Sequence, residues 1–251
     1  MVHGSEKIDL SIIIPAIRTK EWFRLYRSVE QNCTKYNFEI IFVGPYNLPE
    51  ELQQYTNVKY IRDWGSPARC MNIGASVAEG KYVTWGADDG VIINEIAPCL
   101  DILNDAEGKT VVVTKYLEAH DNIQDDSYYF LSNAYPPLPH MQNEQLIFNI
   151  AFMHLSSYLD LGGCDAIFDV SCMCLADLAV RAHNAKLPTV FYKTPTWKFD
   201  WAPGGEHIPI EKAQAKDWKT FSQVHLDTNR INIPFNNWKN SPKIWKERFH
   251  G

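Results

Sequence analysis

The sequence predicts an α/β fold, with a Rossmann-like sheet flanked by helices in a single domain. Two strand–helix–strand patterns occupy residues 10–43 and 58–85, and their strands are apolar runs of the kind found in buried parallel sheets. With 251 residues, the chain is long enough for one large core and too short for two full-sized domains and a linker. We therefore expect one domain over residues 1–224 and a C-terminal arm over residues 225–251.

Composition and charge exclude several classes of protein. The net charge of −6 argues against a general nucleic-acid binder, because such proteins need a basic surface. No apolar run reaches the roughly 20 residues that a membrane span needs. Residues 1–9 are too polar for a signal peptide. We therefore expect a cytoplasmic protein with no transmembrane segment and no nucleic-acid partner.

The six cysteines predict reduced core thiols. Cys172 and Cys174 are too closely spaced for the usual zinc-binding pair, and no second pair follows them. The remaining cysteines are scattered, mostly through apolar or helical stretches. Reduced thiols fit the cytoplasmic compartment that the polar N-terminus predicts.

The first unit places a loop where α/β proteins bind ligands. Residues 10–14 form an apolar strand, residues 21–32 carry apolar side chains at helical spacing, and residues 38–43 form the second strand. The loop at residues 16–20 follows the carboxyl end of the first strand, where open α/β sheets bind their ligands. The candidate binding residues at this edge are Pro15, Ala16 and Arg18.

The second unit contains a strand at residues 58–61, a helix at 66–79 and a strand at 81–85. Ser66 can accept hydrogen bonds from the free N–H groups of the first helical turn. We expect Gly80 to close the far end of the helix. Both ends of this helix are therefore marked in the sequence.

An acidic turn follows the second unit. Asp88 and Asp89 come directly after a strand, and two adjacent carboxylates make a hard oxygen site for Mg²⁺ or Mn²⁺. Arg69 lies in the first turn of the preceding helix, beside amides that favour an anion. Together these residues predict a cation-held diphosphate. The alternatives are a plain turn at the aspartates and a solvated helix residue at Arg69.

Five short motifs follow one another along the chain. They are Ser11-Ile-Ile-Ile-Pro15, Phe38-Glu-Ile-Ile-Phe-Val43, Gly65-Ser-Pro-Ala-Arg69 with Asn72 and Gly74, Ala78-Glu-Gly-Lys-Tyr82, and Ala87-Asp-Asp89. In this order they resemble the inverting family 2 glycosyltransferases of the GT-A fold, over about residues 10–221. The resemblance implies a mixed sheet, with a nucleotide-binding half at about residues 10–115 and an acceptor-binding half at about residues 116–224.

The resemblance also implies an activity. Such enzymes move a sugar from a nucleotide-diphosphate sugar donor to a hydroxyl acceptor with inversion, assisted by Mn²⁺ or Mg²⁺. The acceptor would be a glycan, a glycolipid or a protein-linked sugar. The implied metal ligands are Asp88, Asp89 and His207. The implied nucleotide-sugar-binding residues are Pro15, Ala16, Arg18, Asp63, Arg69 and Asp88.

On the donor side, two positions depart from the family pattern. Gly44-Pro45 stands where relatives carry an acidic pair that reads the base, so base recognition falls to Asp63 or to backbone groups. Gly86 stands at the first aspartate of the Asp-x-Asp motif, which leaves Asp88 as the metal-contacting position.

The acceptor side offers three candidates for the general base that inversion needs. Gly162-Gly163-Cys164-Asp165 resembles the Gly-Gly-Phe-Asp acceptor motif, with cysteine in place of the aromatic residue. Asp177-Leu-Ala-Val-Arg181 resembles the Asp-Leu-x-x-Arg ending. The candidate bases are Asp165, Asp169 and Asp177. An alternative for Asp177 is a helix salt bridge to Arg181, four residues on.

The remaining elements are expected as helices at residues 92–103, 175–185 and 217–224, strands at residues 109–115 and 189–192, and a helical or mixed stretch at residues 146–159. Residues 118–145 predict a long excursion, in which tyrosines could stack on sugar rings or anchor the loop: Tyr128, Tyr129 and Tyr135. Residues 229–251 predict an arm that wraps the domain or forms an oligomer with a partner chain.

Two other functions stay open. A degenerate metal motif also suits a non-catalytic relative that holds nucleotide or glycan. A nucleotidyltransferase shares the α/β sheet and the acidic site, but it needs a glycine-rich basic loop after the first strand. Residues 16–20 lack the glycines.

Overall fold

The computed structural model describes residues 7–118, 147–200, 210–226 and 229–243. Its strands are β1 (Leu10–Pro15), β2 (Phe38–Gly44), β3 (Val58–Arg62), β4 (Tyr82–Trp85), β5 (Gly90–Ile92), β6 (Val111–Glu118), β7 (Ala151–His154) and β8 (Thr189–Phe199). Its helices are α1 (Trp22–Asn32), α2 (Pro67–Val77), α3 (Ala97–Asp105), α4 (Leu155–Asp160), α5 (Ser171–Asn184) and α6 (Ile210–Leu226), with short 3-10 helices η1 (Thr19–Glu21), η2 (Glu50–Leu52) and η3 (Phe235–Asn240). Both predicted strand–helix–strand units are confirmed.

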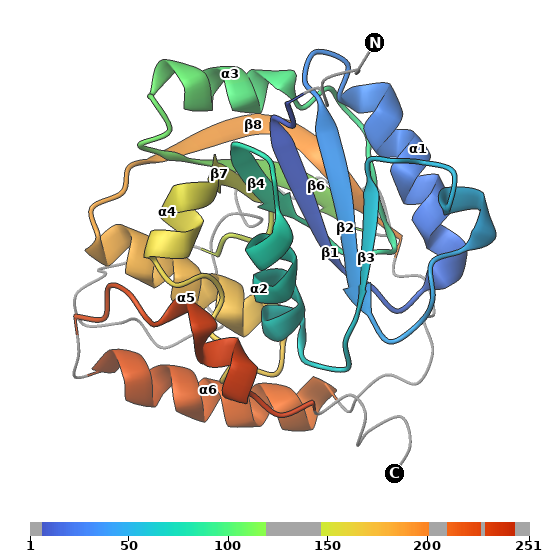
Figure 1. Ribbon diagram of the computed structural model, residues 1–251. Helices are drawn as coiled ribbons and strands as arrows, with labels where there is room; N and C mark the ends of the chain where they lie inside the picture. Colours follow the sequence, from blue (N-terminus) through green and yellow to red (C-terminus); the bar gives the residue numbers. More distant parts are fainter. Residues whose placement is uncertain (1–6, 119–146, 201–209, 227–228, 244–251) are drawn as a thin grey trace.

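The strands of the described residues form one eight-stranded sheet in the order β3-β2-β1-β4-β7-β6-β8-β5. The first four strands of this order are parallel, whereas β7 is antiparallel to both β4 and β6. Figure 1 shows the sheet with helices on both faces. The predicted mixed α/β sheet flanked by helices is therefore confirmed.

The strands bury both of their faces, which explains their continuous apolar sequences. In β1, Ile12 packs into the cluster that contains α1 and α3, and Ile13 packs into the cluster that contains α2 and α5. Because β1, β2 and β4 run in parallel, their carboxyl ends meet at one edge of the sheet. The loops that follow these strands are thereby brought together.

The segment after the acidic turn differs from the prediction. Residues 92–103 were expected as one helix, but β5 ends at Ile92 and α3 begins only at Ala97. The N–H of Ile92 donates to Ser28 Oγ at 2.9 Å, and β5 pairs with β8. The partner strand is about a hundred residues further along the chain, so no local pattern marks this strand.

The expected cap at Gly80 is wrong. Helix α2 ends at Val77, and the N–H of Gly80 donates to Ser11 Oγ at 2.9 Å. A Cβ at position 80 would lie 2.5 Å from the backbone nitrogen of Ser11. Gly80 therefore allows β1 to pass close by. Other elements also extend beyond their predicted ranges, by three residues or more in β6, α5, α6 and β8.

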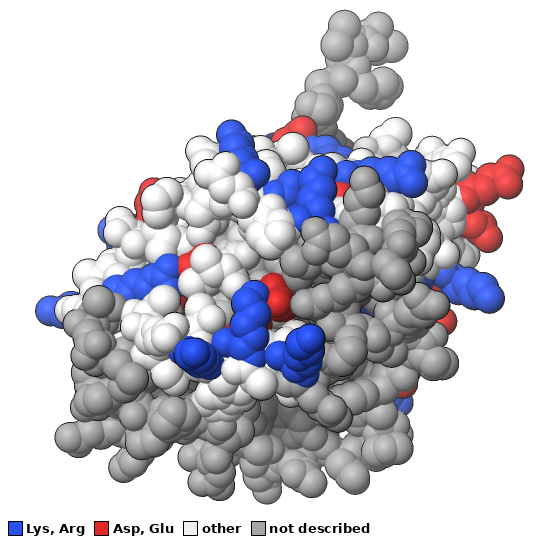
Figure 2. Space-filling view, turned by 90° about the horizontal axis from the view of Figure 1, so that it is seen from below, with Lys and Arg blue, Asp and Glu red and all other residues white. Residues whose placement is uncertain are grey.

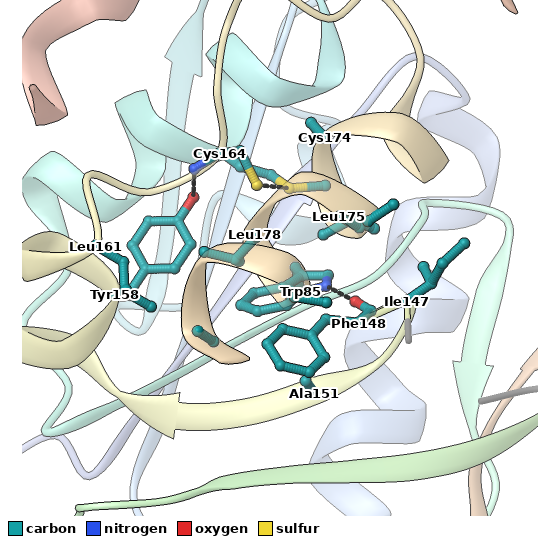
Figure 3. Packing of buried hydrophobic residues seen from close by; sticks show 14 of the residues in the cluster. Trp85, Ile147, Phe148, Ala151, Tyr158, Leu161, Cys164, Cys174, Leu175 and Leu178 are labelled. Atoms are coloured by element: carbon teal, nitrogen blue, oxygen red, sulfur yellow. Dashed lines mark hydrogen bonds between the residues drawn. The ribbon is translucent and has the colours of Figure 1, made fainter. Parts of the chain in front are cut away.

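A dense core lies under the carboxyl end of β4. Figure 3 shows Trp85 among the side chains of this core, and its Nε1 donates to the carbonyl of Phe148 at 2.8 Å. The rings of Trp85 and Tyr158 lie 5.8 Å apart between centroids. This packing fixes the strand that leads into the acidic turn. All six cysteines are free thiols, as predicted. Among the described helices, none is long and apolar enough to cross a membrane.

The described part of the C-terminal arm lies on the domain. Helix α6 continues to Leu226, just past the expected boundary at residue 224. The N–H of Ile233 donates to the carbonyl of Leu161 at 3.2 Å. Gly162 has a φ of +87°, and a Cβ there would lie 2.0 Å from the carbonyl oxygen of Ile233. The glycine turn of the expected acceptor motif thus lets the arm approach the backbone.

Candidate active site

A cavity of about 630 Å³ lies at the carboxyl ends of β1, β2 and β4. The starts of α2 and α5 close its other side. It is lined by most of the residues that the sequence selected: Pro15, Ala16, Arg18, Asp63, Asp88, Asp89 and Asp169. Figure 2 views the molecule from the side toward which β1 and β2 run, and shows lysine and arginine side chains gathered around a small acidic area.

Asp88 fastens the β1–α1 loop to the end of β4. Its Oδ2 accepts hydrogen bonds from the backbone N–H of Ile17 at 2.6 Å, from the backbone N–H of Arg18, and from Trp22 Nε1 at 3.1 Å. Its Oδ1 accepts from Arg18 Nη1 at 2.8 Å. Asp88 is only 1% exposed. The carboxylate is therefore enclosed by the loop that begins after β1.

Arg18 lies between the two carboxylates of the acidic turn. Its Nη2 is 3.8 Å from Asp89 Oδ2, in addition to its bond to Asp88. The Arg18 side chain keeps 16% exposure and lines the cavity. Burial raises the pKa of Asp89 above its usual value, and the guanidinium of Arg18 opposes that shift. The acidic turn thus contains two carboxylates that face the guanidinium of Arg18.

The described residues do not fit a divalent cation at this turn. Three donors converge on Asp88 Oδ2, and Asp88 Oδ1 is paired with the guanidinium of Arg18, so a cation at this carboxylate would have to displace Arg18. In the described parts of the chain, no cluster of three or more His, Cys, Asp or Glu side chains is placed to hold a metal. His207, the third expected ligand, lies outside the described residues. The expected oxygen site is instead an ion pair with Arg18.

Both departures from the family pattern have a packing reason. A Cβ at Gly86 would lie 2.6 Å from Cη2 of Trp197, so the indole fills the space where an aspartate side chain would begin. A Cβ at Gly44 would lie 1.7 Å from the carbonyl oxygen of Ala16. Neither position has room for the acidic residue that relatives carry.

Arg69 contacts a carboxylate rather than the cavity. Its Nε donates to Asp63 Oδ1 at 2.8 Å and its Nη2 donates to Oδ2 at 3.0 Å. Its Nη1 donates to the carbonyl of Trp238, whose ring lies 5.3 Å from the guanidinium. Arg69 is 6% exposed. We expected Arg69 beside the diphosphate, but the structure turns it toward Asp63 and the C-terminal arm. Asp63 itself lines the cavity.

Two of the three candidate bases lie away from the cavity lining. Asp165 accepts from Asn237 Nδ2 at 2.8 Å and from Arg230. Asp177 has no exposed surface and accepts from Arg181 Nε at 2.8 Å and from His225 Nε2 at 2.9 Å. Burial alone would raise the pKa of Asp177, but Arg181, His225 and Arg230 outweigh it and hold that pKa below its usual range. The salt-bridge interpretation of Asp177 is confirmed, and the pair is buried.

Asp169 is the candidate base that reaches the cavity. Its Oδ2 lies 2.8 Å from Lys216 Nζ. Its backbone N–H and that of Val170 donate to Asp217 Oδ2 at 2.7 and 2.8 Å, so Asp217 fixes the start of α5. Burial raises the pKa of Asp217 to about 6. Sequence reasoning missed Lys216 and Asp217 because they are nearly fifty residues away from the turn that they hold.

Solved structures of S. aureus TarS share this architecture. No protein-family model and no curated protein matches the sequence. TarS 1-349 with UDP-GlcNAc superposes with a TM-score of 0.65 and 13% identity over 88% of this chain and 67% of that one. TarS 1-349 with UDP gives 0.60 and 12% over 89% and 73%. The longer TarS structure gives 0.63 and 14%, and this chain covers 40% of it. The chain has a GT-A fold.

The GT-A fold accounts for the position of the cavity at the strand ends. It also brings in side chains that no sequence motif marked. Asn149 and Tyr116 line the wall beside the acidic turn, and Asn149 Nδ2 donates to Tyr116 Oη at 2.8 Å. Phe199, at the end of β8, lies against Tyr116 with ring centroids 5.6 Å apart. These residues come from the second half of the sheet, so their place depended on strand pairing that only the structure gives.

Proposed function

We propose that this protein is a glycosyltransferase that moves a sugar from a nucleotide-diphosphate donor to a hydroxyl acceptor. The observation that carries the proposal is the cavity at the strand ends of a GT-A fold, with a cation at Arg18 and a carboxylate at Asp169 on its wall. TarS structures of the same fold hold UDP and UDP-GlcNAc. A uridine diphosphate sugar is therefore the first donor to test.

The donor half of the cavity lies over β1, β2 and β3. Asp63 and Gly65 line it, and so does Arg18, which contacts the acidic turn. The nucleobase of the donor would lie against Asp63, whose carboxylate is held in place by Arg69. The diphosphate would lie against Arg18, because a guanidinium donates N–H groups in a planar fork that matches phosphate oxygens. The Asp63–Arg69 pair thus positions the donor without reaching the phosphates.

The acceptor half would supply the general base that takes the proton from the acceptor hydroxyl. In a single displacement, the acceptor oxygen bonds to the anomeric carbon as the bond from that carbon to the diphosphate breaks. The acceptor proton passes to a carboxylate, and the electron pair leaves with the nucleoside diphosphate. We assign the base to Asp169, because it is the one of the three candidates that lines the cavity. Attack from the opposite side of the donor would invert the anomeric carbon.

Assays with UDP-GlcNAc and other nucleotide sugars test this function by following the release of free nucleoside diphosphate. Wild type should release it, and Asp169→Asn should release it about 100-fold more slowly, since a general base contributes at least that much. Asp160→Asn is the matched control, because Asp160 is an exposed carboxylate on α4 that does not line the cavity.

Two results would assign another function. Tight nucleotide binding with no release of nucleoside diphosphate would mark a binding protein. Formation of pyrophosphate from a nucleoside triphosphate and a sugar 1-phosphate would mark a nucleotidyltransferase. Either result contradicts sugar transfer.

A further inference from the structure

We propose that Arg18 takes the place of the divalent cation, so that this protein binds the diphosphate of its donor without a metal ion. The inference rests on the proposed function, because it names the group that would face the leaving diphosphate. It follows from the hydrogen bonds of the acidic turn and from the way the surrounding chain is packed.

The first observation is that both oxygens of Asp88 already accept hydrogen bonds from the β1–α1 loop and α1. Its two oxygens receive four hydrogen bonds, and three of them are held by the backbone of residues 17–18 and by the indole of Trp22. A metal ligand at Asp88 would have to displace these donors. Mg²⁺ demands near-ideal geometry around oxygen ligands, so a carboxylate that is already enclosed is a poor ligand.

The second observation is that the loop carrying Arg18 is anchored. Trp22 has no exposed surface and stacks on Phe42 with ring centroids 4.6 Å apart and planes within 8°. The same indole donates to Asp88. The backbone on both sides of Arg18 is therefore tied to the core, and the guanidinium is held at the acidic turn rather than placed there by a mobile chain.

The third observation concerns the other side chains that a metal would need. Position 86 has no side chain, and the ring of Trp197 fills the space in which one would lie. Asp89 is the one remaining carboxylate of the turn, and Arg18 Nη2 lies 3.8 Å from it. Among the described residues, a divalent cation at this turn would therefore find one remaining carboxylate, that of Asp89. It would also compete with the guanidinium of Arg18.

A guanidinium can supply the positive charge that a divalent cation would otherwise bring to the diphosphate. It is always charged, it is planar, and it binds phosphate oxygens through two parallel N–H groups. The positive charge that stabilises the leaving diphosphate would then be built into the chain. Arg18 lines the cavity beside Ala16 and Ala87, so small side chains leave room for the phosphates.

Calorimetry with UDP tests the inference directly. Binding is measured in EDTA and in Mn²⁺ for wild type, Arg18→Gln, Arg18→Lys and the control Arg27→Gln. Arg27 is an exposed arginine on α1 that pairs with Glu30 and does not line the cavity, so its variant loses the same charge elsewhere. Manganese paramagnetic resonance then reports whether wild type with UDP binds the ion.

We expect wild type to bind UDP equally well in EDTA and in Mn²⁺, within about threefold. Arg18→Gln should weaken metal-free binding by about 30-fold, as expected for a lost charge-assisted contact to phosphate. Arg18→Lys should recover part of the loss, since it keeps the charge but not the fork. Arg27→Gln should match wild type. Circular dichroism checks that each variant is folded, and Arg18→Lys carries the test if Arg18→Gln is not.

Three results would overturn the inference. UDP binding that requires Mn²⁺, with bound manganese in the resonance spectrum, would leave the proposed function intact but give the charge to a metal. Equal metal-free binding by Arg18→Gln and wild type would remove Arg18 from the site. Failure of wild type to bind any of UDP, GDP, ADP or dTDP under either condition would reject the proposed function, and the inference with it.

Discussion

Two arginine–aspartate ion pairs of equal length have different surroundings in this protein. The guanidinium nitrogen lies 2.8 Å from the carboxylate oxygen in both Arg18–Asp88 and Arg181–Asp177. Arg18 is 16% exposed and lines the cavity, whereas neither member of the Arg181 pair has any exposed surface. The family pattern selects both aspartates as site residues. The pair at the carboxyl ends of the parallel strands is the one that meets the cavity.

The buried pair holds the second half of the domain together. Arg181 also donates to the carbonyls of Leu161 and Gly163, next to the glycine turn. Asp177 accepts from His225 on α6 and from Arg230 on the arm. This network ties α5 to three other segments. The buried pair therefore serves structure, whereas Arg18 keeps 16% exposure and lines the cavity.

We expect the largest effect, a loss of stability, when the buried Arg181–Asp177 pair is broken. Asp177→Asn leaves Arg181 buried without its counter-charge, which should lower the free energy of unfolding by about 3–5 kcal/mol. Urea denaturation measures this change. Asp105→Asn, an exposed carboxylate at the end of α3, should change stability by less than about 0.5 kcal/mol. A loss below about 1 kcal/mol in Asp177→Asn would show that the pair contributes little.

A third buried aspartate sharpens the contrast. Asp217 also has no exposed surface, but its Oδ2 accepts from two backbone N–H groups rather than from a cation. Its pKa is raised from 3.8 to about 6. Between pH 4 and 6 the folded state therefore keeps a proton that the unfolded state loses, so stability falls as pH rises through this window. A shift of two units corresponds to about 3 kcal/mol.

The Asp217→Asn substitution should remove this fall in stability with rising pH. Urea denaturation at pH 4, 5, 6 and 7 should show the variant gaining stability over wild type up to pH 6 and no further above it. Asp177, with its lowered pKa, has the opposite sign, because its contribution is present above the unfolded pKa and is lost as pH falls. Parallel curves for wild type and Asp217→Asn would contradict the assigned shift.

Breaking the Arg18–Asp88 pair at the cavity should affect function more than stability. Arg18→Gln leaves Asp88 with its bonds from Ile17, Trp22 and the backbone of residue 18, so we expect a stability loss of only about 1 kcal/mol. Release of nucleoside diphosphate from the donor should fall about 30-fold, or about 2 kcal/mol. A variant that unfolds as readily as Asp177→Asn would remove the contrast between the two pairs.

We expect the smallest effect from the substitution that restores the first aspartate of the Asp-x-Asp motif. Gly86→Asp puts a side chain against Trp197 and should lower stability by about 1–2 kcal/mol, as overpacking does. Because Arg18 still pairs with Asp88, the variant should not acquire tight Mn²⁺ binding. Paramagnetic resonance of added manganese checks this. Micromolar binding in Gly86→Asp would show that the turn can form a metal site after all.

The sequence predicted the elements whose causes are local. The apolar run of β1, the helical spacing of α1 and the Ser66 cap of α2 all lie within a few residues of what they determine, and the structure has each of them. The resemblance also selected Pro15, Asp63 and Asp88, and the structure places all three on the wall of one cavity.

The sequence did not predict features set by distant contacts. Arg69 turns to Trp238, about 170 residues away, and the start of α5 is fixed by Asp217. The cation at the acidic turn comes from Arg18, seventy residues before Asp88. Such pairs leave no local pattern, because each residue alone resembles an ordinary charged side chain.

A crystal structure with a nucleoside diphosphate, grown in the presence of Mn²⁺, tests the account most directly through the position of the two phosphates. The account predicts phosphate oxygens within hydrogen-bond distance of the Arg18 guanidinium, inside the cavity at the strand ends, with no ion between Asp88 and Asp89. Phosphates bound elsewhere, or a manganese ion ligated by those aspartates with Arg18 turned away, would contradict it.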